Sequence, residues 1–143
     1  MVRLEFRVEG KPPKKIRGKS LWTAESQVGL VRELRKEAFN ARQSLAIEVL
    51  DGEVSLEVNI FVPESNNDPK RPELFVGDLD NLISGICESV QKPHPRYVYI
   101  SEDSACGKSI LYNDDSQVVS IHALKNVLTN LESAFYRVSI ESK

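Results

Sequence analysis

The sequence predicts an α+β domain in which two main helices pack on a mixed β-sheet. Three observations predict this fold class. Several segments alternate apolar and polar residues, as half-buried strands do. Two other segments repeat apolar residues at helical spacing. Strand and helix patterns are mixed along the chain without strict alternation, which favours a mixed sheet over a regular parallel one. The chain has 143 residues, the usual size of one domain, so we expect a single domain over residues 1–143.

The first third of the chain predicts a strand, a basic loop and a helix. Residues 3–9 alternate apolar and charged side chains, which predicts the first strand. Pro12 and Pro13 cannot continue a β-ladder, so a loop follows. Apolar residues then recur at helical spacing over about residues 23–45, which predicts the first helix. The loop contains no acid and five cations: Lys11, Lys14, Lys15, Arg17 and Lys19.

The rest of the chain predicts further strands around a second helix. A turn at Asp51-Gly52 precedes an alternating strand over residues 54–62. Residues 63–77 hold three prolines and no periodicity, so we expect a long loop of the kind that often has a function. The second helix begins at Asp78 and ends before Pro93. The remaining predicted strands are 109–112, 117–125 and 134–140, with residues 46–50 as a further candidate.

Composition excludes several classes of protein. Hydrophobic residues make up 41% and charged residues 28% of the chain, and no stretch approaches the ~18 apolar residues of a membrane span. We therefore expect no membrane partner. The N-terminus lacks the apolar core of a secretory signal, and we expect a cytoplasmic protein. Neither cysteine lies in a C-x-x-C pair, so no disulfide framework is expected. A zinc site could be drawn from Cys87, His94, Cys106 and His122, but their spacing matches no common zinc module.

Charge is distributed unevenly along the chain. The net charge is −2, which argues against a protein that simply coats nucleic acid. Residues 1–43 carry 11 Lys and Arg against 5 Glu, and residues 44–143 carry 8 against 16 acids, which gives +6 and −8. A basic surface can hold phosphates while an acidic one holds a cation. Solvated charge on two faces explains the same counts equally well.

Four aspartates form a candidate metal site. Asp78 and Asp80 lie at the start of the second predicted helix, and Asp114 and Asp115 lie in a predicted turn. Each has an ordinary explanation, because aspartate is favoured at helix starts and in turns. Together they are hard oxygen ligands of the kind that Mg²⁺ prefers. A bound Mg²⁺ can activate water and orient a phosphate, which phosphodiester hydrolysis requires. Spacing alone does not show whether residues 78 and 115 meet.

Three runs together carry a resemblance to a known family. They are K-P-P-K-K at 11–15, G-D-L-D-N-L at 77–82 and Y-N-D-D-S-Q-V at 112–118. In this order and in these structural contexts they resemble the RusA family of Holliday junction resolvases, over residues 4 to about 125. The resemblance implies a RusA-like fold and a symmetric homodimer that binds branched DNA and nicks opposed strands. It also implies Mg²⁺, with Mn²⁺ as an alternative, and no nucleotide cofactor.

The resemblance assigns roles to residues by their position in the motifs. Asp78, Asp80 and Asp115 match the family's metal-binding, catalytic acids. Asn81 and Asp114 match its accompanying polar residues, Asn81 on the DNA side and Asp114 with the metal. The family commonly has a lysine four residues after the second aspartate of D-x-D-N, where this chain has Ser84. A lysine there stabilises transition-state charge, and Lys108 or a cation of residues 11–19 is a candidate replacement.

The predicted DNA contacts come from the two loops. The five cations of the basic loop are predicted to contact phosphates. Phe75 is a candidate apolar wedge at an opened junction, although a core contact is the more ordinary role for one phenylalanine. Gly107-Lys108-Ser109 does not form a phosphate-binding loop, because the motif's first glycine would fall at Glu102. Two alternatives to a nuclease remain: a junction-binding module that has lost efficient catalysis, and an unrelated small α/β protein.

Overall fold

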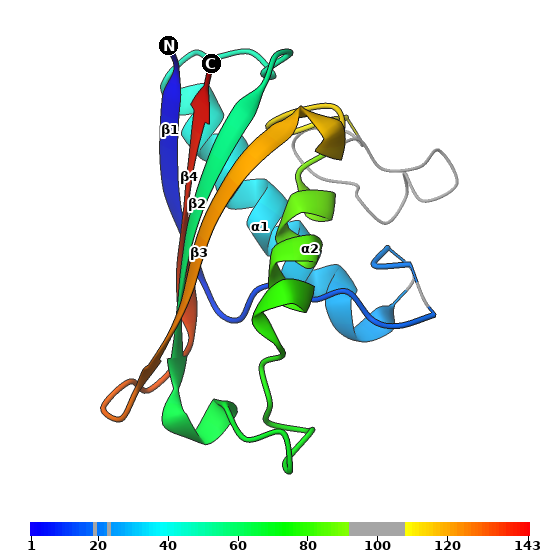
Figure 1. Cartoon of the computed structure of the whole chain (residues 1–143), viewed down its shortest axis with the longest axis vertical. Helices are drawn as coiled ribbons and strands as arrows, with labels where there is room; N and C mark the ends of the chain where they lie inside the picture. Colours follow the sequence, from blue (N-terminus) through cyan, green and yellow to red (C-terminus); the bar gives the residue numbers. More distant parts are fainter. Residues whose placement is uncertain (19, 23, 92–107) are drawn as a thin grey trace.

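The computed structural model describes residues 1–18, 20–22, 24–91 and 108–143. Four strands form one mixed sheet in the order β1-β4-β2-β3, and helices α1 and α2 lie on the same side of it (Figure 1). The predicted fold class is therefore confirmed. The elements in chain order are β1 (Arg3–Glu9), α1 (Glu25–Ser44), β2 (Val54–Pro63), the 3-10 helix η1 (Glu64–Asn66), α2 (Leu79–Ser89), the 3-10 helix η3 (Asp115–Gln117), β3 (Val118–Leu128) and β4 (Phe135–Ser142).

The last strand joins the first to the rest of the sheet. β4 pairs antiparallel with both β1 and β2, so that Ile140 lies opposite Leu4 on one side and Leu56 on the other. The two termini lie at the same end of the molecule (Figure 1), where the Ser142 amide donates to the Val2 carbonyl over 2.8 Å. β2 and β3 are parallel, which requires a crossover connection, and residues 64–117 with α2 provide it.

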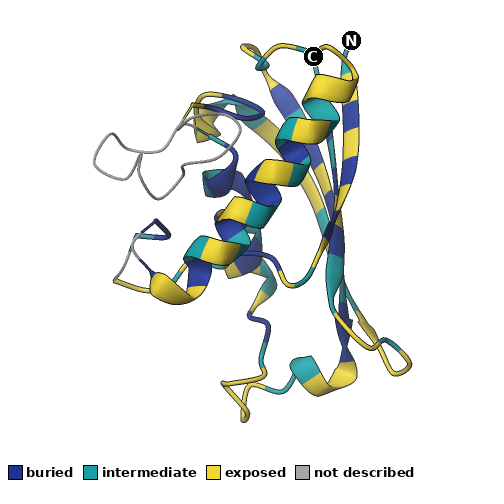
Figure 2. Ribbon diagram, turned by 180° about the vertical axis from the view of Figure 1, so that it is seen from behind, coloured by how far each residue is buried: buried dark blue, intermediate teal, exposed yellow. Residues whose placement is uncertain are grey.

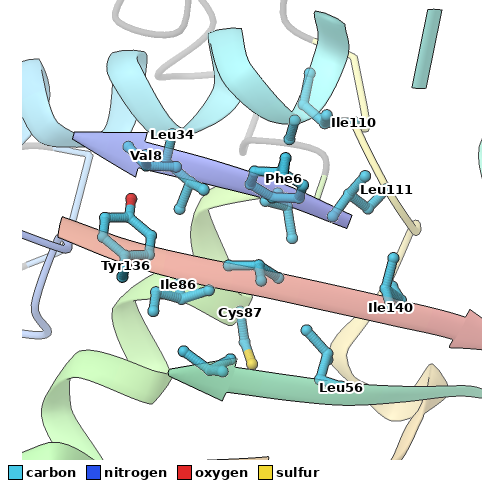
Figure 3. Packing of buried hydrophobic residues seen from close by; sticks show 14 of the residues in the cluster. Phe6, Val8, Leu34, Leu56, Ile86, Cys87, Ile110, Leu111, Tyr136 and Ile140 are labelled. Carbon is cyan, nitrogen blue, oxygen red and sulfur yellow. The ribbon is translucent and has the colours of Figure 1, made fainter. Parts of the chain in front are cut away.

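The core lies between the sheet and the two helices. Alternate residues of β1, β2 and β4 are buried, as the alternation in the sequence predicted. Leu34 of α1 and Ile86 of α2 pack against Phe6, Leu56 and Ile140 of the strands (Figure 3). The opposite side of α1 is exposed (Figure 2). Within the described residues no helix is long and apolar enough to cross a membrane.

A buried arginine holds the end of α2. Arg35 of α1 has no exposed surface, and its guanidinium donates to the carbonyls of Ser89, Gln91 and Lys108. It also lies 5.6 Å from the centroid of the Trp22 ring. The last carbonyls of a helix lack partners within the helix, and a cation there also suits the helix dipole. Arg35 therefore fixes where α2 ends relative to α1.

The predicted strand at 109–112 is wrong, because these residues pack under α2 instead of joining the sheet. The amides of Ile110 and Leu111 both donate to the Val90 carbonyl, over 2.9 and 3.1 Å. The Tyr112 hydroxyl donates to the Cys87 carbonyl over 2.9 Å. Within the described part of the chain, a single isolated bridge, between Leu50 and Tyr112, stands where the strands at 109–112 and 46–50 were predicted. Strand β3 begins one residue later than the strand predicted at 117–125 and ends three residues further along the chain.

Candidate metal and nucleic-acid site on helix α2

The start of α2 presents two carboxylates to solvent. Asp78 occupies the N-cap position, but its side chain makes no capping hydrogen bond. Asp80 lies in the first turn, and both residues are exposed. Carboxylates at a helix N-terminus are favourable because they face the positive end of the helix dipole. The sequence analysis offered helix capping as the ordinary role of Asp78. Because the Asp78 side chain makes no capping hydrogen bond, that role does not explain it.

Lys125 of β3 is anchored beside this helix start. Its ammonium donates to the Gly77 carbonyl over 2.7 Å and lies 4.8 Å from the centroid of the Phe75 ring. Burial lowers the pKa of Lys125, and the charge of Asp78 opposes that shift. Gly77 has a φ of 124°, a conformation that favours glycine and lets its carbonyl meet the lysine. Phe75 is half-buried and its ring packs on Lys125 rather than in the main core.

The basic loop runs directly along α2. The Lys15 amide donates to the Asn81 carbonyl over 3.1 Å. At Gly85, one turn further, a Cβ atom would lie only 2.1 Å from the Pro13 carbonyl oxygen. The Lys14 amide is fixed from the other side by the Gln27 side chain of α1, at 2.8 Å. The loop backbone is thus pressed against the helix that carries Asp78 and Asp80.

The loop cations differ in exposure. Lys11, Lys15 and Arg17 are exposed, and Lys14 is half-buried with its side chain beside Gly77. Lys19 lies outside the described residues. The charge of Lys15 lowers the pKa of Glu88, so the charge of the basic loop acts on the last turn of α2.

Asp115 lies at the other end of α2, next to an acid that the sequence analysis missed. The Gln91 side-chain Nε2 donates to the Asp115 carboxylate over 3.0 Å. Burial raises the pKa of Glu88, Lys15 lowers it, and the charge of Asp115 raises it further. Residues four apart lie along one side of a helix, so Asp80, Ser84 and Glu88 form a row. That spacing was the available signal for Glu88.

Asp114 has a structural task at the start of η3. Its carboxylate accepts a hydrogen bond from the Ser116 amide over 2.8 Å, and the Gln117 side chain accepts from the Asp114 amide over 3.0 Å. The hydrogen bonds from Ser116 lower the pKa of Asp114. This capping box fixes the turn, and with it the neighbouring Asp115.

The structure thus separates the predicted acids between the two ends of α2 and does not gather them in one cluster. Asp78 and Asp80 share the start of α2, and Asp115 joins Glu88 at its end. At 1.5 Å per residue, the helix rises roughly 12 Å between residues 80 and 88. Among the residues described, no three Asp, Glu, His or Cys side chains lie where they could share a metal ion. Mg²⁺ usually takes one or two protein carboxylates, so the oxygen chemistry of either pair suits it.

The zinc alternative gains no support from the described residues. Cys87 is buried, and burial raises the pKa of its thiol, whereas a zinc ligand must lose its proton. His122 is exposed on β3. Cys106 and His94 lie outside the described residues.

Comparison with known proteins leaves the family of this chain open. No protein-family model matches the sequence, and no curated protein matches it.

Proposed function

We propose that this protein is a metal-dependent endonuclease that cuts branched DNA by hydrolysing phosphodiester bonds. One observation carries the proposal: the backbone of the basic loop lies against α2, through Lys15 and Asn81 and through Pro13 and Gly85. Cations that attract phosphates and carboxylates that attract a metal ion therefore belong to one surface. A phosphate held by the loop would lie next to the acids, which is the arrangement that metal-assisted hydrolysis needs.

The chain's own residues have distinct tasks in this proposal. Asp78 and Asp80, or Asp115 and Glu88, would hold Mg²⁺ or Mn²⁺. The bound ion would supply an activated water and neutralise charge on the leaving oxygen. The other roles fall to residues near these acids. Lys11, Lys15 and Arg17 bind phosphates, Asn81 makes a polar contact with DNA, Lys125 fixes the start of α2, and the Asp114 cap positions Asp115.

The choice of branched DNA as the substrate rests on the resemblance to the RusA family. The same resemblance supports a homodimer, which presents two equivalent sites to the two opposed strands of a junction. Phe75, held on the loop before α2, is the proposed contact with bases that are unstacked at the branch point. We also propose a cytoplasmic location.

Incubation of the protein with a synthetic four-way junction and Mg²⁺, beside a duplex of the same sequence, tests the proposal. The junction should be nicked and the duplex left intact. Asp80→Asn removes a charge that would hold the metal, so cleavage should fall by about a hundredfold or more, while junction binding persists. Glu5→Gln, an exposed acid on β1 at the opposite edge of the sheet from β3, is the control and should cut normally. Cleavage that Asp80→Asn leaves intact would sink the mechanism.

A second candidate function is a junction-binding module without efficient catalysis. Ser84 favours it, because this exposed residue stands on α2 where the family commonly has a lysine. In that case the unmodified protein binds junctions with Mg²⁺ present and does not cut them. Ser84→Lys, which restores a cation one turn after Asp80, should then produce cleavage.

A further inference from the structure

The open face of the sheet is the side away from α1 and α2, and neither helix packs on it (Figure 1). It is formed by the alternate residues of each strand that do not enter the core. At the end of this face away from the two termini, two phenylalanines and two arginines lie together. They are Phe61 of β2, Phe135 and Arg137 of β4, and Arg7 of β1. None of these four residues belongs to the candidate site on α2.

Three of these side chains form a stack that crosses three strands. The half-buried rings of Phe61 and Phe135 are nearly parallel, with an interplanar angle of 13° and centroids 4.7 Å apart. The Arg7 guanidinium lies 3.8 Å from the centroid of the Phe135 ring. Because β1 and β2 flank β4, Arg7 and Phe61 cover opposite faces of the Phe135 ring. The outer face of Phe61 is therefore the end of the stack and points toward β3.

Strand β3 continues the open face beyond Phe61 with apolar surface. Its pairing with β2 places Leu124 and Leu128 on the same face as Phe61, and these leucines are 47% and 42% exposed. Asn126 lies directly opposite Phe61, and its side-chain amide donates to the Ile60 carbonyl over 3.2 Å. That hydrogen bond holds the Asn126 side chain close to the backbone of β2. A flat, apolar group can therefore extend the stack over β3.

The two arginines beside the rings have hydrogen-bond donors to spare. Arg7 and Arg137 lie directly opposite each other in the ladder, where like charges repel. Arg7 uses its Nε to bind the Glu9 carboxylate over 2.6 Å, which is one of five donors. Among the described residues, Arg137 makes no ion pair. The other acids of this face lie nearer the termini: Glu5, Glu57 and Glu141. A phosphate between the two arginines would offset their repulsion.

We propose that the open face binds a single strand of nucleic acid, with a phosphate held between Arg7 and Arg137 and a base stacked on Phe61 over β3. Aromatic rings beside cations are the combination by which proteins bind single strands with little sequence preference. A base within a duplex is covered on both sides by its neighbours, so the strand that offers a free base is unpaired. This surface lies across the sheet from α2 and does not depend on the proposed nuclease activity.

Fluorescence anisotropy of a labelled oligothymidine, measured with the full chain in EDTA so that no DNA is cut, tests the proposal. The unmodified protein should bind the strand. Arg137→Gln should weaken binding and reduce the slope of its salt dependence by about 0.7, because one phosphate contact is lost. Phe61→Leu keeps an apolar side chain without a ring and should weaken binding by about fivefold or more. Circular dichroism and thermal melts check that each variant is folded.

Two control variants separate this surface from its surroundings. Arg3→Gln removes an exposed arginine of the same face that lies opposite Glu141, and Lys15→Gln removes a cation of the basic loop. Both should bind oligothymidine as the unmodified protein does. A protein that does not bind the strand would overturn the proposal, as would equal losses in Arg137→Gln and Lys15→Gln. A loss in Arg137→Gln without one in Phe61→Leu would show a site for phosphate alone and would also refute it.

Discussion

At the scale of single residues, the neighbouring acids Glu88 and Asp115 link stability to pH. Burial and the charge of Asp115 raise the pKa of Glu88 above its ordinary value. The folded protein therefore retains a proton on Glu88 at pH values where the unfolded chain has lost it. The free energy of unfolding consequently falls as pH rises from the ordinary glutamate pKa through the raised one.

Glu88→Gln should remove this fall in the free energy of unfolding with rising pH. Without divalent ions at about pH 7, we expect the variant to be more stable than the unmodified protein by about 0.2–1 kcal/mol, the range for exposed charge pairs. The difference should vanish near pH 3, where Glu88 is protonated. Denaturant unfolding at both pH values measures it. Glu5→Gln, an exposed acid on β1 at the other edge of the sheet, is the control, and equal behaviour of the two variants would contradict the prediction.

The buried guanidinium of Arg35 makes a second prediction at this scale. Arg35→Met preserves the length of the side chain but leaves the carbonyls of Ser89, Gln91 and Lys108 without their donor. An unpaired buried polar group costs about 1–3 kcal/mol, so the variant should lose at least ~3 kcal/mol or fail to fold. Lys36→Met, on the exposed side of the same helix, should change stability by less than about 0.5 kcal/mol. Thermal melts of the two variants distinguish them.

At the scale of elements, the contact between the basic loop and α2 depends on one glycine. A Cβ at Gly85 would overlap the Pro13 carbonyl, whereas a Cβ at Gly29 of α1 would meet no atom within 4 Å. Gly29→Ala should therefore stabilise the protein by about 0.5–1 kcal/mol, the usual gain in a helix interior. Gly85→Ala should destabilise it in spite of the same helical preference, and should weaken junction binding because the loop must move. Stabilisation by both substitutions would show that the loop is not held against α2.

The elements that the sequence predicted well are those whose periodicity is imposed by one buried face. Residues 3–9 and 54–62 alternate because β1 and β2 bury one side each, and α1 shows helical spacing for the same reason. The run Ile110-Leu111-Tyr112 is buried on all sides, and a short buried run has no period that separates a strand from a connection. Its amides bond to Val90, a residue 20 positions away along the chain, so local pattern could not predict the outcome.

At the scale of the whole molecule, the candidate site was predicted in its parts but not in its assembly. The motifs identified Asp78, Asp80, Asp115 and the basic loop. The arrangement of these parts follows from the sheet order and from the packing of the loop on α2, which no local pattern encodes. Lys125 lies 47 residues after Asp78 and became its neighbour only through the parallel pairing of β2 and β3. Glu88 differs, because its helical spacing from Asp80 was visible in the sequence.

The position of β4 between β1 and β2 has a consequence for synthesis on the ribosome. Among the described strands of the sheet, β1 is made before the other three, yet its partner β4 is made after them. The first strand must therefore wait, with Leu4, Phe6 and Val8 unburied, until β4 has left the exit tunnel. Chain elongation at about 5–20 residues per second makes this interval several seconds or more. The nascent chain is thus exposed to chaperones and to misassembly during this interval, and the sheet closes only when β4 becomes available to β1.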